Sequence, residues 1–163
     1  MANKHSGGCL CGEVRYETEG EPIRTTVCHC LFCQKVTGTA YLVEAIFPTS
    51  ALRVTKGTTG LHSHRSTGSG MMVHLHFCPR CATKTHLTFE RLPDLCGIFT
   101  GTYDDPHWNA VTPENSRHIF LGVARPDTIV PAGVDTYVEH VTKDGAPQQA
   151  TVHDAPHVVG RLG

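Results

Sequence analysis

The segment Cys28-His29-Cys30-Leu31-Phe32-Cys33 brings three cysteines into six residues. Cysteines at this spacing rarely reach the separation and dihedral angle that a disulfide needs. Three thiolates can instead converge on one zinc ion if the backbone turns between them. A structural zinc site is normally closed by four protein ligands, whereas a catalytic site keeps one position open. The segment therefore predicts either a tri-cysteinyl zinc whose fourth position takes water or an incoming thiol, or a structural zinc completed by His29 or by a distant residue.

Four further cysteines form two half-sites. Cys9 and Cys11 lie in the glycine-flanked segment GGCLCG, and Cys78 and Cys81 lie in the segment FCPRC. Together they supply the four thiolates of a closed tetrahedral zinc site. The alternative is a redox-active CxxC, but the βαβ context of such motifs is missing from this sequence. We therefore expect these four cysteines to hold a structural zinc that ties the N-terminal region to the middle of the chain.

The eighth cysteine, Cys96, lies in the apolar segment 94–99. Free cysteine is among the most buried residue types and behaves as a small hydrophobic side chain. We expect Cys96 to be such a residue. It could also be the fourth ligand of the second zinc, which would close that site.

Two histidine pairs and one acidic turn are weaker candidates. His62-x-His64 and His74-x-His76 each place two imidazoles on one face of a strand, a pattern that favours a polar surface or hydrogen bonds near a metal over direct ligation. The segment GTYDDP, residues 101–106, has the composition of a turn. Its carboxylates could act as a base or bind a substrate amine, but the turn interpretation is favoured.

The composition places the chain in a broad class. It has 163 residues, of which 39% are hydrophobic and 18% charged, as in a globular protein. A net charge of -1 gives no reason to expect nucleic acid or an anionic membrane as a partner. No apolar run approaches the roughly 20 residues of a membrane span, and the first residues, MANKHSGG, lack a signal-peptide core. Eight cysteines without an export signal indicate a reducing compartment, and we expect a cytoplasmic protein.

Short strands dominate the expected secondary structure, and the class is mainly β. Runs of alternating or β-branched residues predict strands over 13–19, 23–27, 40–47, 52–54, 61–65, 71–77, 83–89, 95–100 and 118–124. One helical turn is expected at 34–38. We expect residues 1–142 to form a single zinc-binding β domain and residues 143–163 to form a loosely packed tail.

Several motifs together resemble a known family. The segments GGCLCG, CHCLFC, FCPRC, GTYDDP and HIFLGVARP, in this order, are similar to those of the glutathione-dependent formaldehyde-activating enzymes, which share a domain with centromere protein V. The resemblance spans roughly residues 5–125. It implies a β-tent fold with two Zn²⁺ per chain. It also implies that Cys9, Cys11, Cys78 and Cys81 hold a structural zinc, while Cys28, Cys30 and Cys33 hold the zinc at the reaction site.

The resemblance further implies a carbon–sulfur lyase that adds the thiol of glutathione, as co-substrate, to formaldehyde. Its expected partners are therefore a small-molecule thiol and an aldehyde-like substrate. Two positions depart from the family: Ala82 stands where glycine usually follows the CxxC, and the segment after Arg125 lacks a frequent tryptophan. A carrier of glutathione without catalysis, or a structural two-zinc scaffold for a protein partner, are the alternatives. An exposed sheet edge could also pair two chains into a homodimer.

Overall fold

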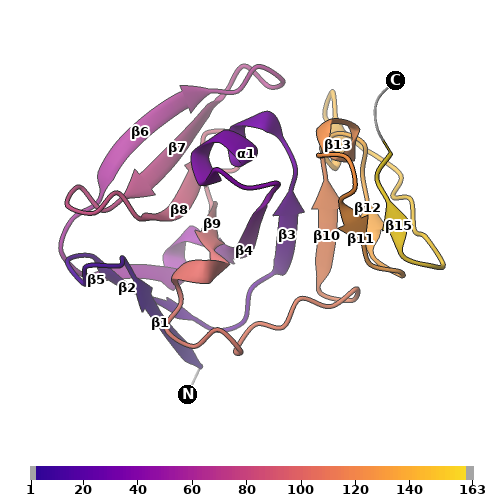
Figure 1. Cartoon of the computed structure of the whole chain (residues 1–163). Helices are drawn as coiled ribbons and strands as arrows, with labels where there is room; N and C mark the ends of the chain where they lie inside the picture. The colour runs from indigo at the N-terminus through magenta and orange to yellow at the C-terminus, as the bar shows by residue number, and fades with distance from the viewer. Residues whose placement is uncertain (1–2, 161–163) are drawn as a thin grey trace. The chain divides into compact units, whose positions relative to one another are not determined.

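The computed structural model describes residues 3–160 and is mainly β, which confirms the expected class (Figure 1). Residues 1–2 and 161–163, at the outer ends of the expected domain and tail, lie outside the described residues. Within the described part, α1 (Leu31–Thr37) is the α-helix; it begins inside the three-cysteine segment, three residues before the expected turn. No helix formed by residues 3–160 has the length and apolar character needed to cross a membrane.

The chain divides into two units, each built from two parts of the sequence. The first unit contains the described residues up to Ile23 together with Glu44–Ala110, and the second contains Arg24–Val43 and the described residues from Val111 onward. The first unit holds β1 (Lys4–Gly8), β2 (Arg15–Glu19), most of β4 (Leu42–Pro48), η1 (Thr49–Ala51), β5 (Leu52–Lys56), β6 (Gly60–Arg65), β7 (Met72–Phe77), β8 (Lys84–Phe89), β9 (Leu95–Phe99) and η2 (Thr100–Thr102). The second holds β3 (Arg24–Cys28), α1, β10 (Ser116–Ile119), η3 (Leu121–Val123), β11 (Ile129–Val130), β12 (Asp135–Thr136), β13 (Thr142–Lys143), β14 (Ala146–Pro147) and β15 (His157–Val158).

Two antiparallel arrangements form the first unit. Strands β4, β9, β8, β7 and β6 are neighbours in that order, and β1, β2 and β5 form a separate three-stranded sheet. In β2, Tyr16 and Thr18 are buried while the residues between them are not, as the period-two pattern predicts. The turn between β7 and β8 carries Cys78 and Cys81, and the loop between β1 and β2 carries Cys9 and Cys11.

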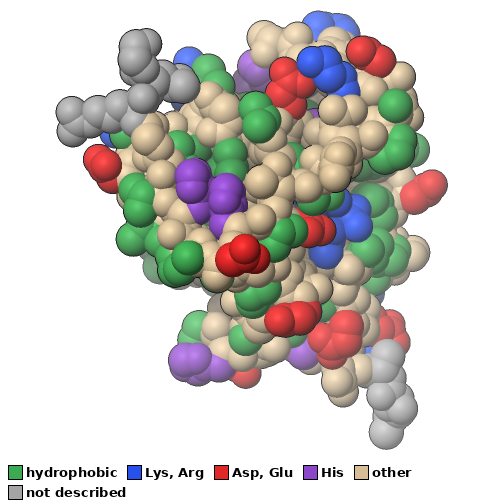
Figure 2. Space-filling model, turned by 90° about the vertical axis from the view of Figure 1, so that its right-hand side faces the viewer, with side chains coloured by type: hydrophobic (Ala, Val, Ile, Leu, Met, Phe, Trp, Pro, Cys, Tyr) green, Lys and Arg blue, Asp and Glu red, His purple; other side chains and the backbone are tan. Residues whose placement is uncertain are grey.

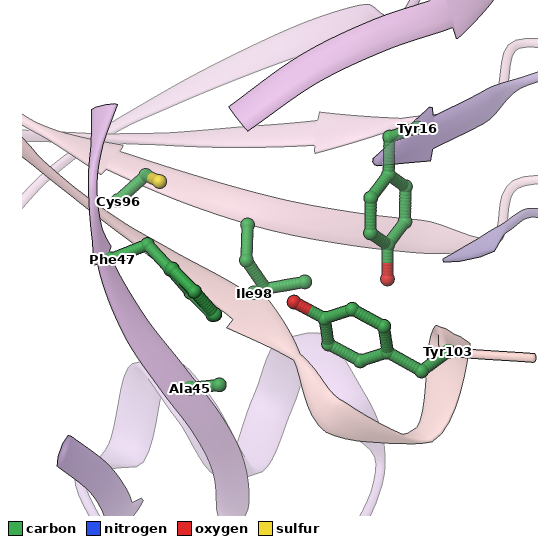
Figure 3. Packing of buried hydrophobic residues seen from close by; sticks show 6 residues of the cluster. All are labelled: Tyr16, Ala45, Phe47, Cys96, Ile98 and Tyr103. Carbon is green, nitrogen blue, oxygen red and sulfur yellow. The ribbon is translucent and has the colours of Figure 1, made fainter. Parts of the chain in front are cut away.

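The core of the first unit lies on one face of these strands. Figure 3 shows the cluster of Tyr16, Ala45, Phe47, Cys96, Ile98 and Tyr103. Phe47 lies directly opposite Cys96 in the pairing of β4 with β9. The hydroxyls of the two tyrosines are satisfied by threonine hydroxyls, Tyr16 by Thr102 at 2.7 Å and Tyr103 by Thr18 at 3.0 Å. Buried polar groups thus keep their hydrogen bonds inside an otherwise apolar cluster.

Strand β1 was not predicted from the sequence, because Gly7 and Gly8 are typical of a turn. Gly7 is paired with Tyr16, and the absence of a side chain lets the tyrosine ring lie over the strand. A Cβ built on Gly7 would lie 2.5 Å from the ring of Tyr16 and 2.6 Å from the carbonyl oxygen of Thr102. Here glycine is required by close approach and not by a turn.

Parallel pairing organises the second unit. Strand β10 pairs parallel with β3 on one side and with β12 on the other. The strand expected over 118–124 is wrong beyond Ile119, because Phe120 adopts a left-handed backbone with φ of 61° and turns the chain into η3. The register sets Ile119 opposite Cys28, so β10 runs beside the strand that leads into the three-cysteine segment.

Ordered pairs continue into the region expected to be a tail. Strand β15 pairs antiparallel with β11, β13 pairs with β14, and Thr151 bridges to Thr136. On the face that carries the C-terminal strands, histidines lie among hydrophobic and uncharged side chains (Figure 2). His153 and His157 stack with ring centroids 4.1 Å apart. The domain boundary at residue 142 stays a prediction.

Candidate metal centres

The first unit gathers four cysteine sulfurs. Cys9, Cys11, Cys78 and Cys81 place their Sγ atoms within 4.8 Å of one another, with Cys9 and Cys11 3.5 Å apart and Cys11 and Cys78 3.8 Å apart. A tetrahedral ion with Zn–S bonds of about 2.3 Å sets its sulfurs about 3.8 Å apart. The four thiols of this tetracysteine cluster therefore fit zinc in number, in chemistry and in spacing.

Local hydrogen bonds hold the tetracysteine cluster in place. The main-chain amide of Val14 donates to the Cys9 sulfur at 3.2 Å. The Thr83 hydroxyl lies 3.2 Å from the Cys81 sulfur and also accepts from the amide of Leu10, so it joins the two half-sites. This hydroxyl, followed by backbone hydrogen bonds of Thr83 and Cys11, lowers the pKa of Cys81 to about 5 and favours the thiolate that a metal needs.

Ala82 closes the turn of the tetracysteine cluster in an unusual conformation. Its φ is 60°, and its amide donates to the carbonyl of Cys78 at 2.8 Å. A left-handed backbone costs an L residue other than glycine roughly 1–2 kcal/mol. The departure from glycine noted in the sequence thus falls on a position that demands a left-handed residue.

The second unit gathers the three cysteines of the organising segment. Cys28 ends β3, Cys30 is the N-cap of α1, and Cys33 lies in the first turn of that helix, so the sulfurs come within 4.8 Å of one another. The amide of Cys33 donates to the Cys30 sulfur at 3.4 Å. The helix start therefore provides the backbone turn that a tricysteine cluster requires.

Charge in the tricysteine cluster is distributed unevenly. Hydrogen bonds from the thiols of Cys28 and Cys33 lower the pKa of Cys30 to about 3. Hydrogen bonds with Cys28 and Cys30, followed by burial, raise the pKa of Cys33 well above its usual value. The protein alone stabilises one thiolate and resists further negative charge in the same place. A donor set of this kind is suited to a cation that balances the remaining charges.

No fourth ligand joins the tricysteine cluster among the described residues. No other histidine, cysteine or acidic side chain of residues 3–160 places a ligand atom within the 4.8 Å group. Cys96 is buried in the core of the first unit, opposite Phe47. His29 directs its Nε2 to His118, at 3.0 Å from Nδ1. Neither Cys96 nor His29, which the sequence offered as a fourth ligand, belongs to the tricysteine cluster. That Cys28, Cys30 and Cys33 bind zinc stays a prediction.

His29 and His118 form a buried imidazole pair that sequence reasoning did not find. Burial, and then the neighbouring His118, lower the pKa of His29 to about 4, and burial lowers the pKa of His118. Both rings are neutral at pH 7, so a single proton serves the hydrogen bond between them. The sequence signal was weak, since only the pairing of β3 with β10 brings the two residues together.

Neither expected histidine pair joins a metal group of three ligands among residues 3–160, and both histidines of the His74-x-His76 pair make hydrogen bonds. His74 contacts the Ser63 hydroxyl at 2.8 Å, and both ring nitrogens of His76 contact threonine hydroxyls. His76 stacks on His86, its cross-strand neighbour, with ring centroids 4.1 Å apart. Burial, followed by the charge of His76, lowers the pKa of His86 to about 3. This second buried imidazole was also missed, because it comes from a different strand.

The turn expected over 101–106 is confined to the end of the segment: Gly101 and Thr102 belong to η2, Tyr103 bridges to Gly7, and the chain bends from Asp104 onward. The Asp105 carboxylate accepts from the amide of His107 at 2.8 Å. Asp104 pairs with Arg15, whose guanidinium lowers the pKa of that carboxyl. Both carboxylates have partners that explain their presence without a substrate.

The fold and the two cysteine clusters define a mainly β protein with two candidate zinc sites, one closed by four thiols and one open. The family model of the glutathione-dependent formaldehyde-activating enzymes matches residues 4–122, and the chain belongs to this family. A crystal structure of a Rhodobacter sphaeroides protein, a structural genomics target, is similar to the chain at 23% sequence identity and a TM-score of 0.49. The match covers 67% of this chain and 92% of that one.

Proposed function

We propose that this chain is a zinc-dependent carbon–sulfur lyase or synthase that joins a thiol to a small aldehyde, or reverses that reaction. Family membership supports a function of the glutathione-dependent, formaldehyde-activating type. Glutathione is accordingly the first thiol to consider and formaldehyde the first aldehyde. Both are small molecules.

One observation carries the proposal. Cys28, Cys30 and Cys33 gather their sulfurs, and within the described chain no fourth ligand atom lies with them. A structural site would be closed by four protein ligands, as the tetracysteine cluster is. Three protein ligands leave one position for a group that comes from solution.

The three cysteines would hold the working zinc. A zinc ion bound there would lower the pKa of an incoming thiol, so that the nucleophilic thiolate is present near neutral pH. The chain keeps the cluster fixed through α1, where the side-chain Nε2 of Gln34 donates to the carbonyls of His29 at 2.7 Å and Val123 at 2.9 Å. This clamp ties the three-cysteine segment to η3.

The bond changes are balanced without an oxidant or reductant. The thiolate sulfur attacks the aldehyde carbon and forms the C–S bond, and the electron pair of the C=O π bond moves to oxygen. The proton released by the thiol ends on that oxygen. The sum is R–SH + H₂C=O giving R–S–CH₂–OH. Holding both reactants in a reactive geometry is the main contribution available to the protein.

Initial rates test the proposal. S-Hydroxymethylglutathione formation is measured at fixed free glutathione and formaldehyde, with the zinc-loaded protein, with Cys30→Ala and with Cys96→Ala as the matched control. We expect the rate to rise in proportion to protein concentration, to fall to the uncatalysed rate in Cys30→Ala and to persist in Cys96→Ala. Elemental analysis of the same samples should give two zinc ions per chain, falling to one in Cys30→Ala.

Other outcomes would contradict it. Product bound once per protein molecule without turnover would indicate a carrier. Loss of both zinc ions and of the fold in Cys30→Ala would indicate a structural scaffold.

A further inference from the structure

His29 lies between two cysteines of the tricysteine cluster but on the opposite side of the chain. Successive side chains of an extended segment point in opposite directions, and Cys30 is still extended, with φ of −62° and ψ of 155°. Cys28 and Cys30 therefore present their thiols on one side, and the His29 ring occupies the other, where it is fully buried. A rotation of this three-residue segment would move the imidazole and the two thiols together.

The ring of His29 is held by a residue from another strand. Its Nε2 lies 3.0 Å from Nδ1 of His118, with the ring centroids 5.2 Å apart and the planes 26° from parallel. His118 is itself 6% exposed. The rings of Tyr41 and His29 pack in an edge-type arrangement at a centroid distance of 5.2 Å. Nδ1 of His29 is buried and has no hydrogen-bond partner among residues 3–160, so the contact with His118 is the polar contact that fixes the ring.

The main chain of His29 is fixed as well. Its main-chain amide donates to the carbonyl of Ile119 at 3.0 Å, and its carbonyl accepts from the side-chain Nε2 of Gln34 at 2.7 Å. The residue is thus anchored through its amide, its carbonyl and its ring. These anchors come from β10 and α1, and none is a sulfur of the cluster.

We propose that the buried His29–His118 pair is a positioning device for the tricysteine cluster, and that His118 acts on the cluster through His29. The pair sets the direction in which Cys28 and Cys30 present their thiols, and so determines how tightly the cluster holds a metal. This inference rests on the proposal that these cysteines hold the working zinc. His118 is a positioning residue here and contacts no substrate.

A purely structural role for the pair gives a different expectation. A histidine that only fills the core would affect the stability of the fold, with no preference for one metal centre. A positioning residue changes the geometry and affinity of the tricysteine cluster and spares the tetracysteine cluster. Removal of partners that orient metal ligands typically lowers metal affinity about 10- to 100-fold. The two clusters in one chain therefore serve as test and internal control.

The test compares two substitutions of His118. His118→Phe keeps a planar ring and removes the hydrogen bond, whereas His118→Asn places an amide atom near the position of Nδ1 and can restore it. His153→Asn is the matched control, because His153 stacks on His157 and belongs to neither cluster. Zinc affinity is measured by competition with a chromophoric chelator, and the binding step that Cys30→Ala abolishes is assigned to the tricysteine cluster. Cobalt(II) spectra of the same variants report the ligand geometry.

We expect His118→Phe to weaken that binding step at least about tenfold and to alter the cobalt bands assigned to it, with the other step unchanged. His118→Asn should restore the affinity, and His153→Asn should match the wild type. If His118→Phe does not fold, Gln34→Met, which removes the other side-chain anchor of His29, should show the same selective weakening.

Equal affinities and spectra in folded His118→Phe and wild type would overturn the inference, as would equal weakening at both clusters. Failure of the proposed function looks different. In that case the wild-type protein itself gives no protein-dependent rate, whatever the effect of His118 on metal binding.

Discussion

Cys96 provides a direct test of how the cysteines are divided. Its side chain is fully buried in the core of the first unit, and its sulfur lies with neither cluster. We expect Cys96→Ala to retain the wild-type zinc content and to lose a small, calculable amount of stability. The same substitution at Cys81, which lies in the tetracysteine cluster, should remove one zinc ion.

The cost of Cys96→Ala can be estimated from what is removed. Removal of a buried group about the size of a methylene costs about 0.8 kcal/mol in transfer free energy. A residual cavity of about 25 Å³ adds about 0.6 kcal/mol at roughly 24 cal/mol per Å³. The free energy of unfolding should therefore fall by about 1.4 kcal/mol. For a chain of this size, that corresponds to a fall in Tm of about 3–6 °C.

Urea denaturation of the zinc-loaded protein, followed by tryptophan fluorescence, measures the free energy, and elemental analysis measures the zinc. The reasoning is refuted if Cys96→Ala loses a zinc equivalent, since Cys96 would then be a ligand. A loss of stability above about 4 kcal/mol would also refute the reasoning. Losses that large are exceptional for point mutants, and a cavity of this size cannot account for one.

Three further predictions concern stability. The pKa of His86 lies near 3 in the folded protein. As the pH falls below about 6.5, His86 is therefore protonated in the unfolded chain before it is protonated in the folded one. The free energy of unfolding should then decrease by up to about 1.4 kcal/mol per pH unit. Denaturation of zinc-loaded His86→Gln between pH 7.5 and 5.5 should show a smaller decrease than the wild type, and an identical pH profile would contradict this. Gly7→Ala should cost about 1–3 kcal/mol because its Cβ would meet the Tyr16 ring, whereas Gly68→Ala, with open space around its Cβ, should stay within about 0.5 kcal/mol of wild type in the same assay. Ala82→Gly should raise the free energy of unfolding by about 0.5–1 kcal/mol because it relieves a positive φ; a lower value than wild type would show that this turn is not strained.

Local patterns in the sequence were sufficient to predict the mainly β fold class and the division of seven cysteines into a group of four and a group of three. Period-two alternation in a segment such as β2 reports a half-buried strand, because side chains of a strand point to opposite faces. Three cysteines in six residues cannot be far apart, whatever the fold. The division of seven cysteines into four and three follows from spacing of this kind, and the structure gathers both groups.

What the tertiary structure decided depends on which strands become neighbours. The register of β10 against β3 puts His118 beside His29, and the pairing of β4 with β9 puts Cys96 opposite Phe47. No local pattern carries this information, because hydrogen-bonded strand pairing joins segments far apart in the chain and its register is set by burial on both partners. The sequence alone determined which cysteines make up the two clusters. Only the packing of strands determined that no fourth candidate ligand among the described residues joins Cys28, Cys30 and Cys33, and that His29 pairs with a buried His118.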